Sequence, residues 1–286
     1  MKPAPFSYHR PESVADAVAL LSRLEDAKIL AGGQSLMAMM NFRYLAPDHI
    51  VDINRIPELT EIAEDGDTIR LGAMVRQRDA MESPVVRARC PLMIEALTHI
   101  GHIQTRNRGT IGGSLSHLDP AAELPAAFSA LDAVLHVTGS RGDRDVPIGE
   151  WSLGYMMPNL EPDELLVGIT APCWPDGHGY AFLEMARRHG DFALAGAAAL
   201  MTLNGDGSIR RVAIALTGVD MGPVRLTETE VLLTGKRPDE ALFAEAAKAA
   251  ESVAGIDDVH ASADYRRRLA VVYARRALVL AHERAA

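Results

Sequence analysis

Apolar residues near the start of the chain recur with the period of a helix. They share one stripe and are Val14, Ala17, Val18 and Leu21. Ser13 and Asp16 form the pattern of a capping box at its beginning. The pattern predicts an amphipathic surface helix over 13–21.

Shorter apolar runs in the following segment predict strands separated by turns. The strands are expected at 28–30, 49–53 and 68–71, the last one after the Asp-Gly-Asp turn at 65–67. Between the first two lies Ala-Gly-Gly-Gln-Ser at 31–35, which predicts a turn. The apolar run at 36–40 is expected to be buried.

The middle of the chain predicts one helix, one long loop and two more strands. Pro91 opens a helix that is expected to reach residue 97, and strands are expected at 133–137 and 164–170. The segment 98–125 is rich in Gly, Ser, His and Asn, so it is predicted to be irregular. A long irregular segment in a compact domain is usually functional.

The last part of the chain predicts a different arrangement. Prolines and glycines at 172–179 mark a domain boundary near residue 176. Three strands at 180–187, 192–203 and 208–216, with a hairpin turn at 204–207, precede helices at 238–253 and 262–284. The fold class is therefore expected to be α+β, ending in a three-stranded antiparallel sheet backed by helices.

Charge and cysteine content exclude several classes of protein. Lys plus Arg is 29 and Asp plus Glu is 38, a net charge of −9 that argues against nucleic-acid binding. The basic run at 266–268 lies in a predicted helix and is expected to be a solvated face. Two cysteines, Cys90 and Cys173, cannot hold an iron–sulfur cluster or a four-cysteine zinc site. A disulfide between them is left open.

The start of the chain has no apolar run of the kind found in signal peptides. The longest apolar segment, 192–203, is too short to span a bilayer. We therefore expect a soluble, cytoplasmic protein without a transmembrane segment, with peripheral membrane contact left open.

Two glycine-rich segments carry the candidate chemistry. The first is 31–35, and the second is Arg-Gly-Thr-Ile-Gly-Gly-Ser at 108–114. Because glycine lets a ligand approach the backbone, paired glycines suit the binding of a phosphate by N–H groups. Each segment taken singly is more simply a structural turn. Together they predict a cradle for a diphosphate, formed by oriented backbone dipoles and not by lysines.

Other nucleotide and catalytic motifs do not fit. Neither segment has the G-x-G-x-x-G spacing, and Gly235-Lys236 is followed by Arg, so there is no P-loop. Met37 stands where a nucleophile elbow needs its second glycine. His99, His102, His117 and Asp119 have side chains that suit a metal, but no second signature segment supports such a site, and none is expected.

The glycine segments belong to longer runs that resemble a known family. The runs are 31–36 with Asp-Ile-Asn at 52–54, and Thr-Arg-Asn-Arg-Gly-Thr-Ile-Gly-Gly-Ser at 105–114 with Asp-Pro-Ala-Ala-Glu-Leu-Pro at 119–125. They resemble the FAD-binding medium subunits of molybdenum hydroxylases, of the aerobic carbon monoxide dehydrogenase type. The resemblance implies a two-lobed FAD-binding domain of the vanillyl-alcohol-oxidase type at 1–176, split near 57, and a C-terminal flavoprotein domain at 177–286.

The resemblance also implies which residues contact FAD. The cofactor-binding residues that it implies are Ala31, Gly32, Gly33, Gln34, Ser35, Leu36, Thr110, Ile111, Gly112, Gly113, Ser114, His117, Asp119, Glu123, Leu166 and Phe192. The two glycine segments would wrap the diphosphate, Glu123 would accept bonds from the adenosine ribose, and Phe192 would stack on the flavin ring. Without the family, Glu123 is a helix-start or surface charge and Phe192 a core residue. His117 and Asp119 would line the cleft or bond to backbone.

One position departs from the family pattern. Some relatives carry a lysine, near the flavin N1/O2 edge, where this chain has Leu-Glu-Met-Ala at 183–186. Either Arg187 or Arg188 replaces that cation, or the flavin is reduced in its neutral form.

The function that the resemblance implies is electron transfer with no catalytic residue in this chain. The expected partners are a large molybdopterin-binding subunit and a small subunit with two two-iron two-sulfur clusters, assembled as a dimer of heterotrimers. Electrons would pass through the clusters to FAD and on to quinone, NAD or oxygen. Two alternatives are a self-contained FAD oxidase or dehydrogenase and a protein that stores or inserts FAD.

Overall fold

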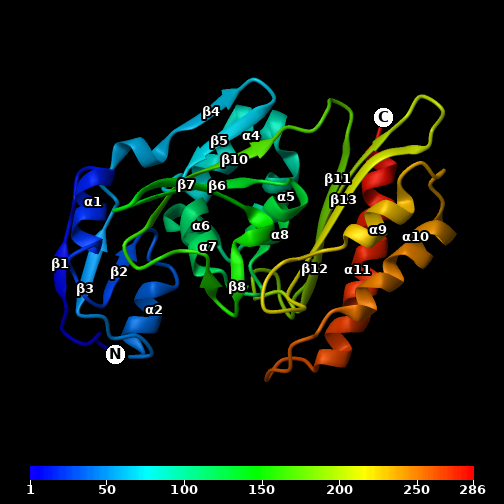
Figure 1. Cartoon of the computed structure of the whole chain (residues 1–286). Helices are drawn as coiled ribbons and strands as arrows, with labels where there is room; N and C mark the ends of the chain where they lie inside the picture. The colour runs from blue at the N-terminus through cyan, green and yellow to red at the C-terminus, as the bar shows by residue number, and fades with distance from the viewer.

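The computed structural model describes residues 1–286 and arranges them around three main sheets that follow one another along the chain (Figure 1). The N-terminal sheet has the order β1-β3-β2, and its pairs are parallel. Its elements are β1 (Ser7–His9), α1 (Val14–Leu21), β2 (Ala27–Leu30), α2 (Leu36–Asn41) and β3 (His49–Asp52), followed by η1 (Pro57–Thr60). This sheet therefore lies entirely before the predicted lobe boundary near residue 57.

The first helix forms as its pattern predicts. The Ser13 hydroxyl accepts a hydrogen bond from the Asp16 amide at 3.1 Å, which satisfies one of the free N–H groups of α1. Ala17, Val18 and Leu21 are buried. The expectation for 36–40 is wrong in part, because this run forms the short helix α2, of which only Met40 is buried.

The middle sheet is antiparallel, with the order β4-β5-β10-β6-β7. Its strands are β4 (Ile62–Asp65), β5 (Thr68–Gly72), β6 (Val134–Gly139), β7 (Gly142–Pro147) and β10 (Leu165–Pro172). Six helices lie between β5 and β6: α3 (Gln77–Glu82), α4 (Pro84–Arg89), α5 (Pro91–His99), α6 (Ile103–Arg108), α7 (Ile111–His117) and α8 (Glu123–Ala130). After β7, η2 (Ile148–Glu150) leads into a small hairpin of β8 (Ser152–Gly154) and β9 (Met157–Pro158).

The prediction of an irregular segment at 98–125 is wrong. It contains α6, α7 and the start of α8, which are short or rich in glycine and serine. Their stability comes from tertiary contacts, because all eight residues of α8 are buried.

The C-terminal sheet has the order β11-β12-β13-β14, all antiparallel. Its strands are β11 (Gly179–Met185), β12 (Ala195–Leu203), β13 (Ile209–Thr217) and β14 (Val224–Arg225). The helices that follow are α9 (Thr227–Leu233), α10 (Glu240–Ala247), η3 (Lys248–Ser252) and α11 (Ala263–Arg284). The three predicted strands are confirmed, and β14 adds a short fourth one.

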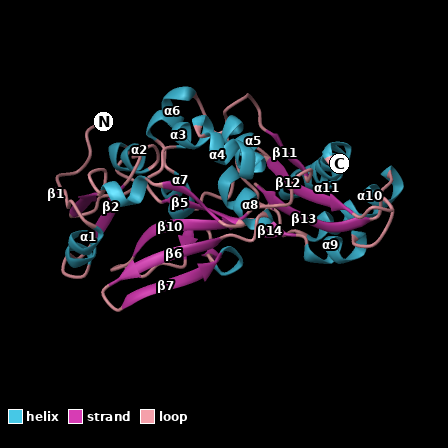
Figure 2. Ribbon diagram, turned by 90° about the horizontal axis from the view of Figure 1, so that it is seen from above, coloured by secondary structure: helices cyan, strands magenta, loops and turns pink.

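The C-terminal sheet is buried on both faces, and Figure 2 shows it between the helices of the middle part and the C-terminal helices. Phe182, Ala198 and Leu200 join the core of the middle part, which includes α5 and α8. Ala197, Ala199 and Met201, on the other face, pack in the core with α10 and α11. The domain limits near 57 and 176 stay predictions, although both fall between sheets.

Three further features bear on the predictions. Cys90 and Cys173 are free thiols, so no disulfide forms. No helix combines the length and the apolar character that crossing a membrane requires. The strands β4 and β7 and the helix α9 were not predicted from the sequence.

The expectation that 266–268 is a solvated face is wrong for Arg266. Its side chain is 5% exposed, and Nη1 donates to the carbonyl oxygens of Leu194 at 2.7 Å and Gly218 at 2.8 Å. Nη2 pairs with Asp258 at 2.6 Å. The guanidinium therefore ties the first turn of α11 to the ends of β12 and β13.

Replacing Arg266 by Met is predicted to lower the free energy of unfolding by about 3–5 kcal/mol, because buried carbonyls and the Asp258 carboxylate lose their partner. Arg268→Met is the matched control, since Arg268 is exposed two residues later, and its effect is expected to stay within about 0.5 kcal/mol. Urea unfolding of both variants measures this. Equal stability of the two variants would contradict the role of Arg266.

Candidate functional site

The two glycine segments meet in space. A Cβ atom on Gly32 would lie 2.4 Å from the Arg108 carbonyl oxygen and 2.9 Å from the Gly109 Cα. Real Cβ atoms essentially never come that close, so only glycine permits this contact at position 32. A Cβ on Gly113 would lie 3.6 Å from the Ala31 Cβ, so the second half of 110–114 also faces the first segment.

Two polar side chains hold the glycine segments together. The Asn54 amide nitrogen donates to the Ala31 carbonyl at 2.8 Å, and the Asn54 amide oxygen accepts from Arg76 Nη2 at 2.5 Å. Arg76 Nη1 donates to the Arg108 carbonyl at 2.5 Å. Arg76 therefore bridges the segments, and it places a half-buried guanidinium beside them. No sequence pattern singled it out.

The first segment offers its backbone amides to a ligand. None of the amides of residues 32–36 donates a hydrogen bond to an acceptor in the chain. Gly33 has φ +73°, which turns the backbone at the centre of this run. The Ser35 side chain makes no capping bond to α2. Successive N–H groups without partners form a concave site for an anion.

The second segment differs, because most of its amides already have partners. The Ile111 and Gly112 amides donate to the carbonyls of Val75 and Ala73 at 3.0 and 2.9 Å. The Gly113 amide donates to the Thr110 hydroxyl, which caps α7, at 3.0 Å. The segment 110–114 can therefore contribute to an anion site through its closely placed backbone and the Ser114 hydroxyl, but not through an array of free amides.

The other predicted residues lie in different environments. Asp119 accepts from the Ala121 amide at 2.8 Å, so it bonds to backbone, and burial lowers the pKa of His117. Phe192 is 70% exposed in the loop before β12, so its interpretation as a core residue is wrong. Leu166 is 3% exposed in the core beside Val137 and offers little surface to a ligand.

Glu123 is buried at the first position of α8 and is not a surface charge. It is 8% exposed. Burial, followed by the negative charge of Glu184 on β11, raises its pKa to about 8. Glu184 belongs to the run 183–186 that replaces the relatives' lysine, and its side chain is 3% exposed. A buried carboxyl group, that of Glu184, thus lies in the run where the family pattern has a lysine.

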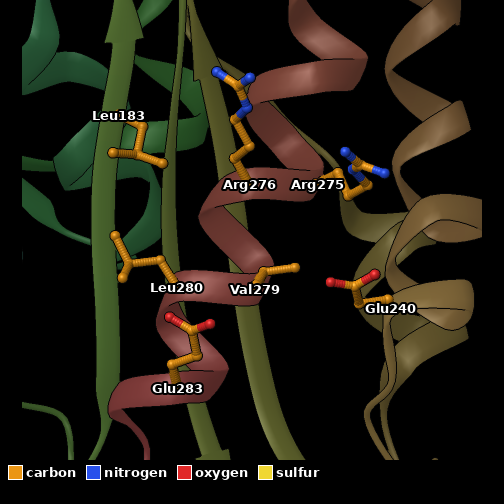
Figure 3. Close-up of a pocket in the computed structure, with 7 residues that line it drawn as sticks. All are labelled: Leu183, Glu240, Arg275, Arg276, Val279, Leu280 and Glu283. Carbon is orange, nitrogen blue, oxygen red and sulfur yellow. The ribbon is translucent and has the colours of Figure 1, made fainter.

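One hollow of the molecule lies apart from this site. It has a volume of about 330 Å³ and lies between α10, α11 and β11 (Figure 3). Its charged lining consists of Glu240, Arg275, Arg276 and Glu283. These residues belong to α10 and α11, which lie on the side of the C-terminal sheet away from α5 and α8 (Figure 1). No three histidine, cysteine or carboxylate side chains converge to hold a metal.

The raised pKa of Glu123 predicts a pH-dependent stability. The Glu123 carboxyl binds its proton more tightly in the folded chain than in the unfolded chain, where its pKa is 4.5. The contribution of this proton to the free energy of unfolding is therefore fully present below pH 4.5. That contribution, up to about 5 kcal/mol, is lost as the pH rises through about 8. Urea unfolding of Glu123→Gln should show a flatter pH dependence than wild type. Glu245→Gln, at an exposed position, is the control; a Glu123→Gln profile equal to wild type would contradict the shift.

Comparisons with known proteins match the whole chain. Residues 4–174 match the model of the FAD binding domain in molybdopterin dehydrogenase, and residues 180–281 match the CO dehydrogenase flavoprotein C-terminal domain. The carbon monoxide dehydrogenase medium chain of Hydrogenophaga pseudoflava is 41% identical, with all of both chains covered. The nicotine 6-hydroxylase medium subunit of Paenarthrobacter nicotinovorans is 39% identical over 99% of this chain and 100% of that subunit.

A solved structure agrees with these sequence matches. It is the carbon monoxide dehydrogenase of Hydrogenophaga pseudoflava that lacks the Mo-pyranopterin moiety of its molybdenum cofactor, and one of its chains superposes with a TM-score of 0.98, 42% identity and full coverage of both chains. Both halves of this chain thus match these proteins in sequence and in fold. The family that the glycine-containing runs indicated is confirmed. The chain belongs to the FAD-binding medium subunits of molybdenum hydroxylases.

Proposed function

We propose that this chain carries FAD as the electron-transfer subunit of a molybdenum hydroxylase. It takes electrons from the iron–sulfur clusters of a small partner subunit and passes them to an external acceptor, while a large molybdopterin-binding subunit oxidises the substrate. The observation that carries this proposal is the contact of Gly32 with Arg108 and Gly109, beside five amides without acceptors.

The residues present suit a dinucleotide diphosphate. The amides of 32–36 point to no acceptor in the chain, and the Arg76 guanidinium lies beside them. Glycine at 32 permits the backbone contact between the two segments, and glycine at 113 keeps a further side chain away from Ala31 and the Thr110 hydroxyl. We assign the diphosphate of FAD to residues 31–36 and 110–114, with amides from the first segment and the Ser114 hydroxyl from the second.

The flavin end is assigned to the last residue of α7 and to residues after it. Phe192 presents an exposed ring that suits stacking on a planar ligand. His117 follows the second glycine segment at the end of α7, and Asp119 comes two residues later. When bound, FAD supplies a group that exchanges electrons singly or in pairs, which connects one-electron clusters with two-electron acceptors.

The chain requires partners for the rest of the reaction. Its two cysteines cannot ligate an iron–sulfur cluster, so the clusters belong to another subunit. The relatives are described as a medium chain or medium subunit, which fits a chain that works within a larger enzyme. We propose a dimer of heterotrimers in the cytoplasm, with the domain division at 176.

A bulky residue at position 113 is predicted to abolish FAD retention. The Cβ of Gly113→Val would lie 2.6 Å from the Thr110 hydroxyl, and its methyl groups would enter the space facing Ala31. The dissociation constant for FAD should rise at least roughly tenfold, which corresponds to a loss of about 1.4 kcal/mol or more of binding free energy, and the FAD-to-protein ratio of the purified enzyme should fall with it.

Gly149→Val is the control for this experiment. A Cβ on Gly149 meets no atom within 4 Å, so its FAD content should equal that of wild type. Circular dichroism establishes that both variants are folded. A folded Gly113→Val enzyme with the FAD content of the control would contradict the assignment of the diphosphate.

A further inference from the structure

Arg76 is a half-buried cation at the contact between the two glycine segments. It immediately precedes α3, and its backbone pairs with Thr110 as an isolated antiparallel bridge. The amide of Gln77, the next residue, donates to the Gly109 carbonyl at 2.9 Å. The backbone at Arg76 is therefore fixed to the start of the second glycine segment.

The side chain of Arg76 reaches the point where the first segment meets the second. Its Nη1 donates to the Arg108 carbonyl oxygen at 2.5 Å. This oxygen is the same atom that a Cβ on Gly32 would overlap. The guanidinium therefore lies next to the start of the run of amides at 32–36, which have no acceptor in the chain.

A chain of hydrogen bonds fixes the orientation of this guanidinium from the side of the first segment. Asn54 Oδ1 accepts from Arg76 Nη2 at 2.5 Å. Asn54 Nδ2 donates to the Ala31 carbonyl at 2.8 Å and to Asp52 Oδ1 at 2.5 Å. Asp52 also accepts from the Tyr8 hydroxyl at 2.5 Å. Because carbonyl and carboxylate oxygens accept, the amide nitrogen of Asn54 faces them and its oxygen faces Arg76.

These contacts leave the positive charge of Arg76 without an anionic partner. Both of its acceptors, a backbone carbonyl and a side-chain amide, are neutral groups. Asp79 and Asp52 act on it electrostatically, but neither forms an ion pair with it, and Arg108 adds a second positive charge nearby. Burial, followed by the charge of Arg108, lowers the pKa of Arg76. The guanidinium also has more N–H donors than its two contacts use.

We propose that Arg76 binds the diphosphate of FAD directly and sets the preference of the site for a diphosphate over a ligand with less negative charge. The inference rests on the proposed function, and it adds a charged contact to the amides of 32–36 and the Ser114 hydroxyl. A planar guanidinium donates paired hydrogen bonds to phosphate oxygens. The bonds to Asn54 and Arg108 persist in this contact, because they use only part of the donors of Arg76. The diphosphate is thus the anionic partner of this cation.

Binding of ADP to the full chain without cofactor, measured by titration calorimetry, tests this contact. ADP carries the adenosine and the diphosphate but not the flavin. Arg76→Gln should raise the dissociation constant for ADP at least roughly tenfold, because hydrogen bonds between charged groups are lost. Arg78→Gln is the matched control, since Arg78 is exposed and pairs with Glu82, and its dissociation constant should equal that of wild type. Circular dichroism establishes that every variant is folded.

Arg76→Lys separates a contact with the ligand from a role in joining the segments alone. Lysine keeps the charge but lacks the planar fork that reaches both Asn54 and Arg108. If Arg76 binds the diphosphate, Arg76→Lys should lose less affinity for ADP than Arg76→Gln. The ratio of the dissociation constants of AMP and ADP should fall in Arg76→Gln, because the second phosphate loses its cation. Equal losses in the Lys and Gln variants, or an unchanged ratio, would overturn the proposal.

Two failures are distinguishable in this experiment. Wild type is titrated with FAD as well as ADP, and binding of FAD is followed by the change in flavin fluorescence. If wild type binds neither FAD nor ADP, the proposed function fails. If wild type binds both and Arg76→Gln binds ADP as tightly as wild type, the assignment of Arg76 fails while the proposed function stands.

Discussion

The contact of Gly32 with the backbone at Arg108 and Gly109 is the constraint on which the rest of the structure depends. It joins the N-terminal parallel sheet to the helices of the middle part at a distance that no side chain at position 32 would allow. Asn54 and Arg76 then convert this approach into a hydrogen-bonded bridge. A run of free amides is left at 32–36, since residues 32–35 form a turn and Leu36 begins α2, where the first N–H groups have no acceptor within the helix.

A second set of buried polar contacts places the C-terminal sheet against this frame. Arg266 binds carbonyls at the ends of β12 and β13, and Thr217 binds those before α8. These contacts hold β11, and with it Glu184, against the start of α8. The cost of burying such groups is offset in part by their hydrogen bonds, but Arg266 Nε and one oxygen of the Glu184 carboxyl are left without a partner. A buried carboxyl oxygen without a partner therefore lies between the middle part and the C-terminal sheet, while the free backbone amides lie at the first glycine segment.

Much of this arrangement is predictable from the sequence, for identifiable reasons. The helix after Ser13 and the strands β11 to β13 have strong apolar periodicity. The family resemblance predicted that both glycine segments bind the same ligand. The helices α6 to α8 were not predicted, because their glycine, serine and histidine residues interrupt the apolar periodicity that indicates a helix. These helices are stabilised by burial in the core. The polar edge strands β4 and β7 lack alternation. Arg266 and Glu184 carry charges that only tertiary contacts bury, so no local pattern indicates their roles.

Hydrogen–deuterium exchange of the backbone amides, with and without saturating FAD, tests the central claim most directly. The account predicts that amides 32–36 exchange rapidly without FAD, because they lack acceptors, and become protected when FAD binds. The amides of 111–114 already have partners and should be protected in both states. If FAD binds while amides 32–36 exchange as rapidly as before, the glycine segments do not hold its diphosphate and the account is contradicted.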